Sequence, residues 1–400
     1  MSGMDMDRQQ HTLTPDLLVV GGGMVGAALA LGAAQQGLSV TVLEQHEPEP
    51  WSAELPPQVR VSAISVASVA LLQRLGVWPQ IQAMRTCPYR HLETWEWEGA
   101  QTRFSAQELN LPELGHIVEN SVIQVALWQA LQAHPKVTLL SESGGFTLAR
   151  EDNRWRLTLA DGRQWLPRLL AGADGAQSRV RAQAGIGLSG WQYRQSCLLV
   201  TVKTAAPQQD TTWQRFYPSG PRAFLPLYGQ HGSLVWYDKP ARIKQLSALP
   251  NAQLHKAISQ AFPARLGEFE VLDKGAFALV RRHAQQYVLP GLALLGDAAH
   301  TINPLAGQGV NLGFKDVQAL LEVLDSAVSH QEEIGSLAVL RRYECRRRPD
   351  NLLMQSGMDL FYGLFSNDLP PLRMLRNVGL MVADKSGVLK RQALRYALGL

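Results

Sequence analysis

Cysteine is scarce in this sequence. The 400 residues include three cysteines, an odd number, with no Cys-x-x-Cys pair and no ligand-like spacing to histidine. This pattern argues against both a disulfide framework and a zinc site, so no metal-binding residues are predicted. Such cysteine usage is typical of a reducing compartment, and we expect the chain in the cytoplasm.

Charged residues and long apolar runs are also few. Only 18% of the residues are charged, whereas about a quarter is usual, and this fits large buried surfaces or a sizeable internal ligand. The net charge of +4 is too small to indicate nucleic-acid binding. Residues 17–43 contain no charge, but six glycines interrupt them, so they predict neither a membrane span nor a signal peptide.

Basic residues gather near the C-terminus. Residues 341–400 carry 11 Lys/Arg against 5 Asp/Glu, while the rest of the chain is slightly acidic. This imbalance favours either a solvated helical face or attraction to an acidic surface, such as anionic lipid or a partner protein. The Arg-Arg-Arg run at residues 346–348 has a phosphate-binding alternative, but an exposed helix face is the simpler interpretation.

Glycine, by contrast, is concentrated in two stretches. In the first, residues 16–20 form an apolar run typical of a buried parallel strand, and residues 21–26 then match Gly-x-Gly-x-x-Gly. A helix is predicted over residues 27–36 and a second strand over residues 38–43, which completes a β-α-β unit. The stretch therefore predicts one Rossmann-type dinucleotide site. A second match to the pattern, residues 185–190, follows no strand and precedes no helix, so we predict a loop there.

Each residue of the first pattern has a physical task. Gly21 permits the tight turn, Gly23 lets the backbone approach a pyrophosphate, and Gly26 lets helix and strand pack closely. The helix N-terminus offers free N–H groups and a partial positive charge to the phosphates. Glu44 ends the second strand, where a carboxylate accepts hydrogen bonds from ribose hydroxyls.

The second glycine-rich stretch, GDAAHTINPLAGQGVNLGFKD, covers residues 296–316. A buried strand is predicted over residues 292–295, then a narrow turn carrying Asp297, a bare loop, and a helix over residues 310–324. A carboxylate suits a polyol chain, and a helix N-terminus suits a flat ring that becomes anionic. Both features favour FAD, whose reduced ring carries negative charge. The alternative is a plain strand-turn-helix with glycine at its caps.

This stretch resembles the G-D-A-A-H-x-x-x-P-x-x-G-Q-G-x-N-x-G-x-x-D signature of the single-component FAD aromatic hydroxylases, the p-hydroxybenzoate hydroxylase-like group. Two further stretches agree in order and spacing: VRVSAIS at residues 59–65 and GADGAQSRVR at residues 172–181. The resemblance implies FAD contacts at residues beyond the first glycine pattern. They are Arg60, Gln124, Asp174, Gly175, Asp297, Gly309 and Asn311.

The resemblance also implies which residues lie at the reacting part of the flavin. Pro304 is expected beside the reacting carbon, and Gly307 and Gln308 are expected, with Gly309, against the pyrimidine edge. His300 is either a structural or flavin-loop contact, or a proton shuttle. No catalytic base is identified.

Three long stretches narrow the resemblance to the ubiquinone-biosynthesis hydroxylases: residues 59–78, 119–131 and 354–400. Residues 88–98 are similar to the enzymes that hydroxylate demethoxyubiquinol. The subgroup implies that NAD(P)H reduces FAD, O2 forms a flavin C4a-hydroperoxide, and the ring of a polyprenyl benzoquinol is hydroxylated. A sister enzyme acting at another ring position and a flavin dehydrogenase or reductase that uses no O2 remain alternatives. Other ubiquinone-biosynthesis proteins and the inner face of the membrane are the expected partners.

These features predict an α/β protein in which a Rossmann-type FAD-binding domain carries an inserted β-sheet substrate domain and a helical C-terminal region. The expected FAD-binding segments are residues 1–77, 115–181 and 287–327. The expected substrate-binding segments are residues 78–114 and 182–286, and the helical region is residues 328–400.

Overall fold

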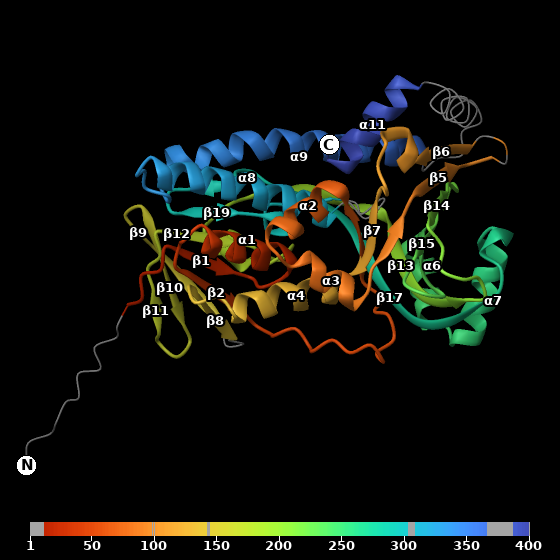
Figure 1. Ribbon diagram of the computed structural model, residues 1–400, viewed down its shortest axis with the longest axis horizontal. Coiled ribbons are helices and arrows are strands. Elements are labelled where there is room, and N and C mark those ends of the chain that lie inside the picture. Colours follow the sequence, from red (N-terminus) through yellow and green to blue (C-terminus); the bar gives the residue numbers. More distant parts are fainter. Residues whose placement is uncertain are drawn as a thin grey trace, which may run out of the picture.

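The computed structural model describes residues 12–97, 99, 101–141, 145–302, 309–365 and 387–399. Figure 1 shows two large sheets side by side along the longest axis, with the long helices α8 and α9 running above the left-hand sheet. The mixed α/β architecture confirms the predicted fold class.

The six-stranded sheet on the left of Figure 1 is parallel except for one antiparallel edge strand. In spatial order its strands are β18 (Val288–Leu289), β19 (Leu292–Leu294), β12 (Leu169–Gly172), β1 (Leu17–Val20), β2 (Val40–Glu44) and β8 (Val137–Ser141). Every residue of β1 and β12 is buried, as expected for parallel strands covered on both faces.

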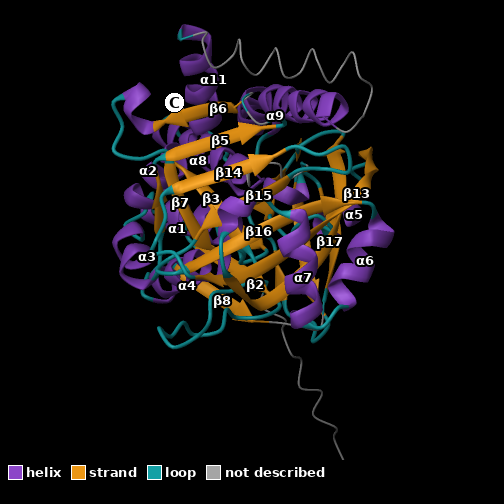
Figure 2. Cartoon of the chain, turned by 90° about the vertical axis from the view of Figure 1, so that its right-hand side faces the viewer, coloured by secondary structure: helices purple, strands orange, loops and turns teal. Residues whose placement is uncertain are grey.

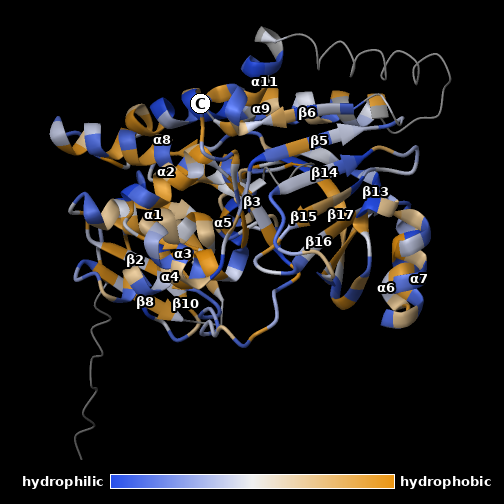
Figure 3. Cartoon of the chain, turned by 45° about the vertical axis from the view of Figure 1, so that its right-hand side comes forward, coloured by the Kyte–Doolittle hydropathy of each residue, from blue (hydrophilic) through white to orange (hydrophobic). Residues whose placement is uncertain are grey.

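Helix α1 (Met24–Gln35) packs between the strands and two further helices, α4 (Asn120–Gln132) and α8 (Gly309–Ser329). Its sequence is rich in alanine and leucine, and nine consecutive residues, 26–34, are buried. Figure 3 accordingly colours most of α1 as hydrophobic. A helix that is apolar all round belongs in a core, so the β-α-β unit predicted from the sequence lies at the centre of this half of the molecule.

The eight-stranded sheet is antiparallel except where β14 pairs with β5. Its strands, in spatial order, are β20 (His300–Thr301), β17 (Phe269–Ala284), β13 (Leu188–Thr204), β16 (His231–Asp238), β15 (Arg222–Pro226), β14 (Thr211–Arg215), β5 (His91–Trp95) and β6 (Gln101–Ser105). Figure 2 shows the order from β6 to β16 directly. The strands predicted in residues 182–286 are thereby confirmed, and the chain enters the sheet from three separate segments, β5–β6, β13–β17 and β20.

Side chains alternate across this sheet, as the two-residue period of a strand requires. Leu198, Val200 and Trp236 pack on one face with α6 (Pro240–Ala248) and α7 (Asn251–Ala261). The opposite face turns toward the other sheets, with Cys197, Leu199, Tyr237, Phe277 and Leu279 gathered on it. This face supplies one wall of the candidate site.

Two smaller sheets complete the fold. One consists of β3 (Val61–Ser65), β7 (Gly115–Glu119) and β4 (Cys87–Tyr89), and the other of β11 (Gln164–Trp165), β10 (Arg154–Leu159) and β9 (Phe146–Glu151). Strand β4 belongs to the predicted substrate segment and pairs with β7 of a predicted FAD segment, so the first small sheet joins the two units. The domain boundaries themselves stay a prediction.

The remaining helices are α2 (Val66–Arg74), α3 (Trp78–Met84), α5 (Arg179–Gln183), α9 (Leu337–Phe365) and α11 (Val388–Leu398). Helices α9 and α11 agree with the predicted helical C-terminal region, while residues 366–386 lie outside the described residues. One local prediction was wrong: residues 188–190 begin β13 and are not part of a loop. Gly190 is needed there because a Cβ would lie 2.0 Å from the carbonyl oxygen of Arg281 on the neighbouring strand.

Candidate functional site

A cavity of about 650 Å³ lies between the two large sheets. This volume is within the range of roughly 300–1,000 Å³ usual for cofactor and ligand sites. Five residues predicted from the sequence line it, although they are far apart in the chain. They are Gly23, Arg60, Gly175, Asp297 and Gly309. Phe277 and neighbouring residues of β17 form the opposite wall.

The glycine turn after β1 has the geometry that the sequence predicted. Gly21 has φ +104°, and a Cβ there would lie 2.4 Å from the carbonyl oxygen of Ala173. A Cβ at Gly26 would lie 1.9 Å from the carbonyl oxygen of Gly21. At Gly23, which lines the cavity, a Cβ would have no neighbour within 4 Å. The turn is therefore tight where it packs against protein and open where it faces the cavity.

Glu44 and two side chains of α4 hold this turn in place. The Glu44 carboxylate accepts a hydrogen bond from the backbone N–H of Gly22 at 2.5 Å. Gln124 Nε2 and Trp128 Nε1 donate to the carbonyl oxygen of Gly22, at 3.1 and 2.7 Å. The side-chain amide of Gln124 is therefore hydrogen-bonded to the glycine turn. Sequence reasoning missed Trp128, whose only sign was a polar ring nitrogen in a helix with many apolar residues.

The GADG loop is shaped by Asp174. Its carboxylate accepts hydrogen bonds from Ser178 Oγ at 2.5 Å and from the backbone N–H groups of Arg179 and Val180 at 2.7 and 3.0 Å. It therefore fixes the start of α5. Gly175, with φ +76° and no neighbour to a Cβ within 4 Å, is the member of the loop that lines the cavity.

Arg181 joins this loop to the turn that carries Asp297. Its guanidinium is buried and donates to the carbonyl oxygens of Ala298 at 2.8 Å and Ala176 at 3.1 Å. Burial lowers the pKa of Arg181, with Arg282 adding to the effect and Asp174 opposing it. The resemblance covered Arg181 but gave it no role, and a single arginine in a short helix carries no signal of such a bridge.

Asp297 lines the cavity, and although protein surrounds it, the residue is exposed to the cavity space. Burial raises the pKa of its carboxyl, and His300 and Arg60 partly oppose that shift. The Arg60 guanidinium lies over the ring of Phe277, 5.7 Å from its centroid. A carboxylate and a cation therefore face one cavity, as a ligand with hydroxyl and anionic parts requires.

His300 is buried beneath the site, where Nε2 lies 2.5 Å from Oδ2 of Asp316. Asp316 also accepts from the Gly296 N–H at 3.0 Å and from Arg347 Nε at 2.8 Å. Burial raises the pKa of Asp316, but His300 and Arg347 outweigh it and bring the pKa to about 2. His300 does not line the cavity, which favours its structural interpretation over the proton shuttle.

Arg347 corrects the sequence interpretation of the arginine run. It was expected on an exposed helix face, but only 7% of it is exposed, because α9 turns this residue toward α8. Besides Asp316, its guanidinium contacts Asp350 at 2.6 Å and Asn351 at 2.7 Å. Arg346 is exposed as expected, and pairs with Glu322 at 2.8 Å.

Asn311 fixes the first turn of α8. Its side-chain oxygen accepts from the Ser65 N–H at 3.0 Å and from Ser68 Oγ at 2.7 Å, and its amide donates to the Ala63 carbonyl at 2.8 Å. Gly309, where α8 begins, borders the cavity. The positive end of the helix dipole therefore points toward the site. Pro304, Gly307 and Gln308 lie outside the described residues, and their roles stay predictions.

A second, largely apolar cavity of about 180 Å³ adjoins the first. The two share Val61, Leu199 and Phe277. Leu92 and Leu225 are among the apolar residues that line it further from the first cavity. The shared side chains place the apolar cavity directly beside the cofactor cavity.

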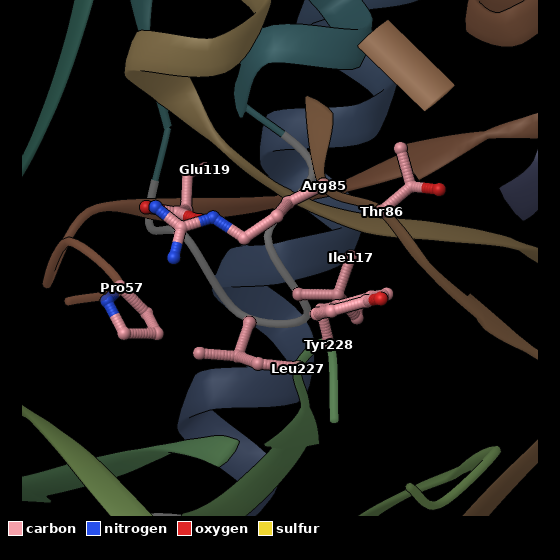
Figure 4. A pocket seen from close by; sticks show the side chains of 7 residues that line it. All are labelled: Pro57, Arg85, Thr86, Ile117, Glu119, Leu227 and Tyr228. Carbon is pink, nitrogen blue, oxygen red and sulfur yellow. The ribbon is translucent and has the colours of Figure 1, made fainter. Parts of the chain in front are cut away.

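A small groove at the surface supports the segment that carries Arg60 (Figure 4). The residues that line it are Pro57, Arg85, Thr86, Ile117, Glu119, Leu227 and Tyr228. Glu119 accepts a hydrogen bond from the Gln58 N–H at 2.8 Å and lies 3.1 Å from Arg85 Nε. Burial raises the pKa of Glu119, while the Gln58 bond and Arg85 oppose the rise. The groove thus ties the end of the long β2–β3 connection to β7.

Comparison with known proteins agrees with this geometry. The model of a family described as "FAD binding domain" matches residues 14–353. The 3-demethoxyubiquinol 3-hydroxylase of Escherichia coli (strain K12) is 60% identical over 385 residues, 96% of this chain and 98% of that protein. This chain belongs to the FAD-dependent aromatic hydroxylases.

Other members of this hydroxylase family are more distant. Ubiquinone hydroxylase UbiL of Rhodospirillum rubrum is 36% identical, over 96% of this chain and 89% of that protein. Among solved structures, p-nitrophenol 4-monooxygenase PnpA from Pseudomonas putida DLL-E4 has a TM-score of 0.79 at 20% identity, over 97% of this chain and 99% of that chain. At this identity the likeness shows a shared fold.

As a member of the FAD-dependent hydroxylases, the chain binds FAD, and its residues fit that cofactor. Gly23, Gly175 and Gly309 all leave open space where a side chain would stand, and all three border the larger cavity. The N-termini of α1 and α8 face the cavity from two sides, and Asp297 adds a hydrogen-bond acceptor. Within the described residues, no helix combines the length and apolarity needed to cross a bilayer.

Proposed function

We propose that this hydroxylase acts on the benzoquinol ring of a polyprenylated ubiquinone precursor, with O2 and NAD(P)H as co-substrates, and that the precursor is a demethoxyubiquinol. The observation that carries the proposal is the apolar cavity that joins the cofactor cavity at Val61, Leu199 and Phe277. It suits an uncharged ring with an apolar substituent. The 60% identity to a 3-demethoxyubiquinol 3-hydroxylase over nearly the whole of both chains supports the substrate class.

The cofactor-binding roles follow from position in the cavity. FAD, when bound, supplies the oxygen-activating chemistry of the reaction. The open backbone at Gly23 and the N-terminus of α1 would hold the pyrophosphate. Glu44, at the adjoining strand end, would accept from the ribose. Asp297 would hold the ribityl chain, with Arg60 providing positive charge beside it.

The remaining residues orient the substrate and exclude water. The N-terminus of α8, which begins at Gly309, would stabilise negative charge that develops on the flavin ring. Pro304, Gly307 and Gln308 precede it and are proposed to lie at the reacting edge. The apolar walls shared by the two cavities would keep water from the reacting atoms, which would limit the loss of reducing equivalents as hydrogen peroxide.

We also propose that the protein contacts the inner face of the membrane at its periphery, where such a substrate resides. Arg391 and Arg395 are exposed on α11, and Leu353 and Leu360 are exposed on the neighbouring helix α9. Basic and apolar groups together suit an anionic lipid surface. The charge-reversal pair Arg391→Glu and Arg395→Glu should abolish sedimentation with phosphatidylglycerol vesicles. Unchanged sedimentation would leave this contact without support.

The deciding experiment is mass spectrometry of quinone lipids from cells that lack this chain. Accumulation of a precursor that lacks one ring methoxyl but carries the ring methyl is the expected result. An earlier precursor would instead indicate a sister enzyme acting at another ring position. A purified-enzyme assay under 18O2 tests the chemistry, because a flavin dehydrogenase or reductase would convert substrate without incorporating label.

A further inference from the structure

Helix α11 forms the end wall of the apolar cavity. Leu394 and Leu398 project from it into the cavity lining, and only 5% and 4% of them are exposed. They pack with Tyr89, Ala63 and Leu114, which belong to the small sheet around β7 and its flanking loop. The cavity therefore runs from the cofactor site at one end to the inner face of α11 at the other.

The cavity is too small to hold a long isoprenoid chain. Its volume is about 180 Å³, below the roughly 300–1,000 Å³ of sites that enclose drug-sized ligands. A quinol ring placed beside Val61 and Phe277, where the cavities meet, would leave room here for the first part of its tail. The rest of the tail has to pass through one of the walls.

Two of the other walls are backed by protein. The core formed with α6 and α7 lies behind the eight-stranded sheet, and α2 lies behind β3. Within the described part of the chain, helix α11 lies at the upper edge of the molecule beside α9 (Figure 1). The tail would reach solvent or lipid soonest by passing this helix.

Polar contacts at its rim hold α11 in place. Lys390 Nζ lies 3.1 Å from Glu108 Oε1, and the Tyr396 hydroxyl donates to Asp350 Oδ1 at 3.3 Å. The Tyr396 contact is exposed, whereas the Lys390 side chain is largely buried beside Glu108 and the ring of Phe104. If the helix shifts outward, an apolar chain lying beneath Leu394 and Leu398 would replace the apolar contacts that these two side chains lose.

We propose that the inner face of α11 is the binding subsite for the isoprenoid tail, and that the tail leaves the protein past Leu394 and Leu398. This inference rests on the proposed function, since it takes the substrate to be a polyprenyl quinol. On α11, the exposed Arg391 and Arg395 lie next to the buried Leu394 and Leu398, so basic groups flank the proposed exit.

The direct test uses the full-length holoenzyme and a demethoxyubiquinol analogue with two isoprene units and a diazirine on the second. After irradiation, peptide mass spectrometry locates the label. Label within residues 388–398 is expected. Label confined to α9, or to the strands of the eight-stranded sheet, would overturn the inference. Competition with the unmodified analogue shows that labelling occurs from the bound state.

A pair of variants gives an independent readout. Leu394→Trp should fill the subsite and lower kcat/KM for the two-isoprene substrate, relative to the substrate without a tail, by roughly tenfold. Val328→Trp adds the same bulk at an exposed position of α8 and should leave the ratio unchanged. An unchanged ratio in Leu394→Trp would contradict the inference. If wild-type enzyme hydroxylates neither substrate, the proposed function itself fails.

Discussion

Asp316 is the residue whose substitution tests the structural account of the site most directly. Its carboxylate is fully buried, and each of its oxygens accepts from two donors. Oδ2 accepts from Gly296 and His300, and Oδ1 from Arg347 and Asn351. The change Asp316→Asn keeps the shape of the side chain, removes its charge and replaces one acceptor oxygen by a donor amide.

Neither orientation of the new amide fits. If its nitrogen points toward Gly296 and His300, it meets the Gly296 N–H, and in the other orientation it meets the Arg347 guanidinium. Either choice leaves the buried Arg347 without its full counter-charge. Removing one partner of a buried ion pair typically costs about 3–5 kcal/mol, and we expect a loss in this range.

Urea unfolding of the holoenzyme and the apoenzyme measures the free energy of unfolding, and flavin fluorescence measures FAD affinity. Asp316→Asn should lower both the free energy of unfolding and the affinity for FAD. The affinity should fall because Asp316 holds the backbone of Gly296, which precedes Asp297 in the cavity wall. Asp325→Asn makes the same chemical change at an exposed position of α8 and is the matched control. A free energy of unfolding within about 0.5 kcal/mol of wild type, as for an ordinary surface change, would refute the argument.

Three further predictions concern separate parts of the fold. Burial lowers the pKa of His116 and His283 to about 4. As pH falls from about 6.5 to 4, the unfolded state therefore binds more protons than the folded state, and the free energy of unfolding should drop by about 3 kcal/mol for each histidine. An acid titration measures this drop, which His283→Gln should roughly halve. Gly26→Ala should abolish FAD binding, measured by fluorescence, because the new Cβ would lie 1.9 Å from a carbonyl oxygen of the turn. The control variant Gly357→Ala has open space around the new Cβ and should bind FAD normally. Trp128→Phe removes one buried hydrogen bond to the glycine turn and should weaken FAD binding by about 1–2 kcal/mol. An FAD affinity equal to that of the wild type would show that the turn does not need this hydrogen bond.

Much of the fold could be predicted because its signals are local. The apolar run before Gly21, the spacing to Gly26 and the strand end at Glu44 together require a strand, a tight turn and a helix, whatever lies elsewhere in the chain. The turn at Asp297 and the helix after it were predictable for the same reason. The family resemblance then connected these stretches into one cofactor site.

Local patterns could not decide which polar side chains are buried together. Arg347 stands in a run of arginines that is typical of a surface, yet it is buried because Asp316, 31 residues earlier on another helix, faces it. Trp128 and Arg181 likewise each donate to a backbone carbonyl more than 100 residues away in sequence.

By itself, then, the sequence determined the β-α-β unit, the positions that must be glycine and the cofactor class, since each depends on the geometry of neighbouring residues. The tertiary structure alone decided that His300 is buried against Asp316, that β13 begins at Leu188, and that Leu394 and Leu398 close the apolar cavity. The reason is physical: burial and charge pairing depend on which distant segments pack together, and no short stretch of the chain contains that information.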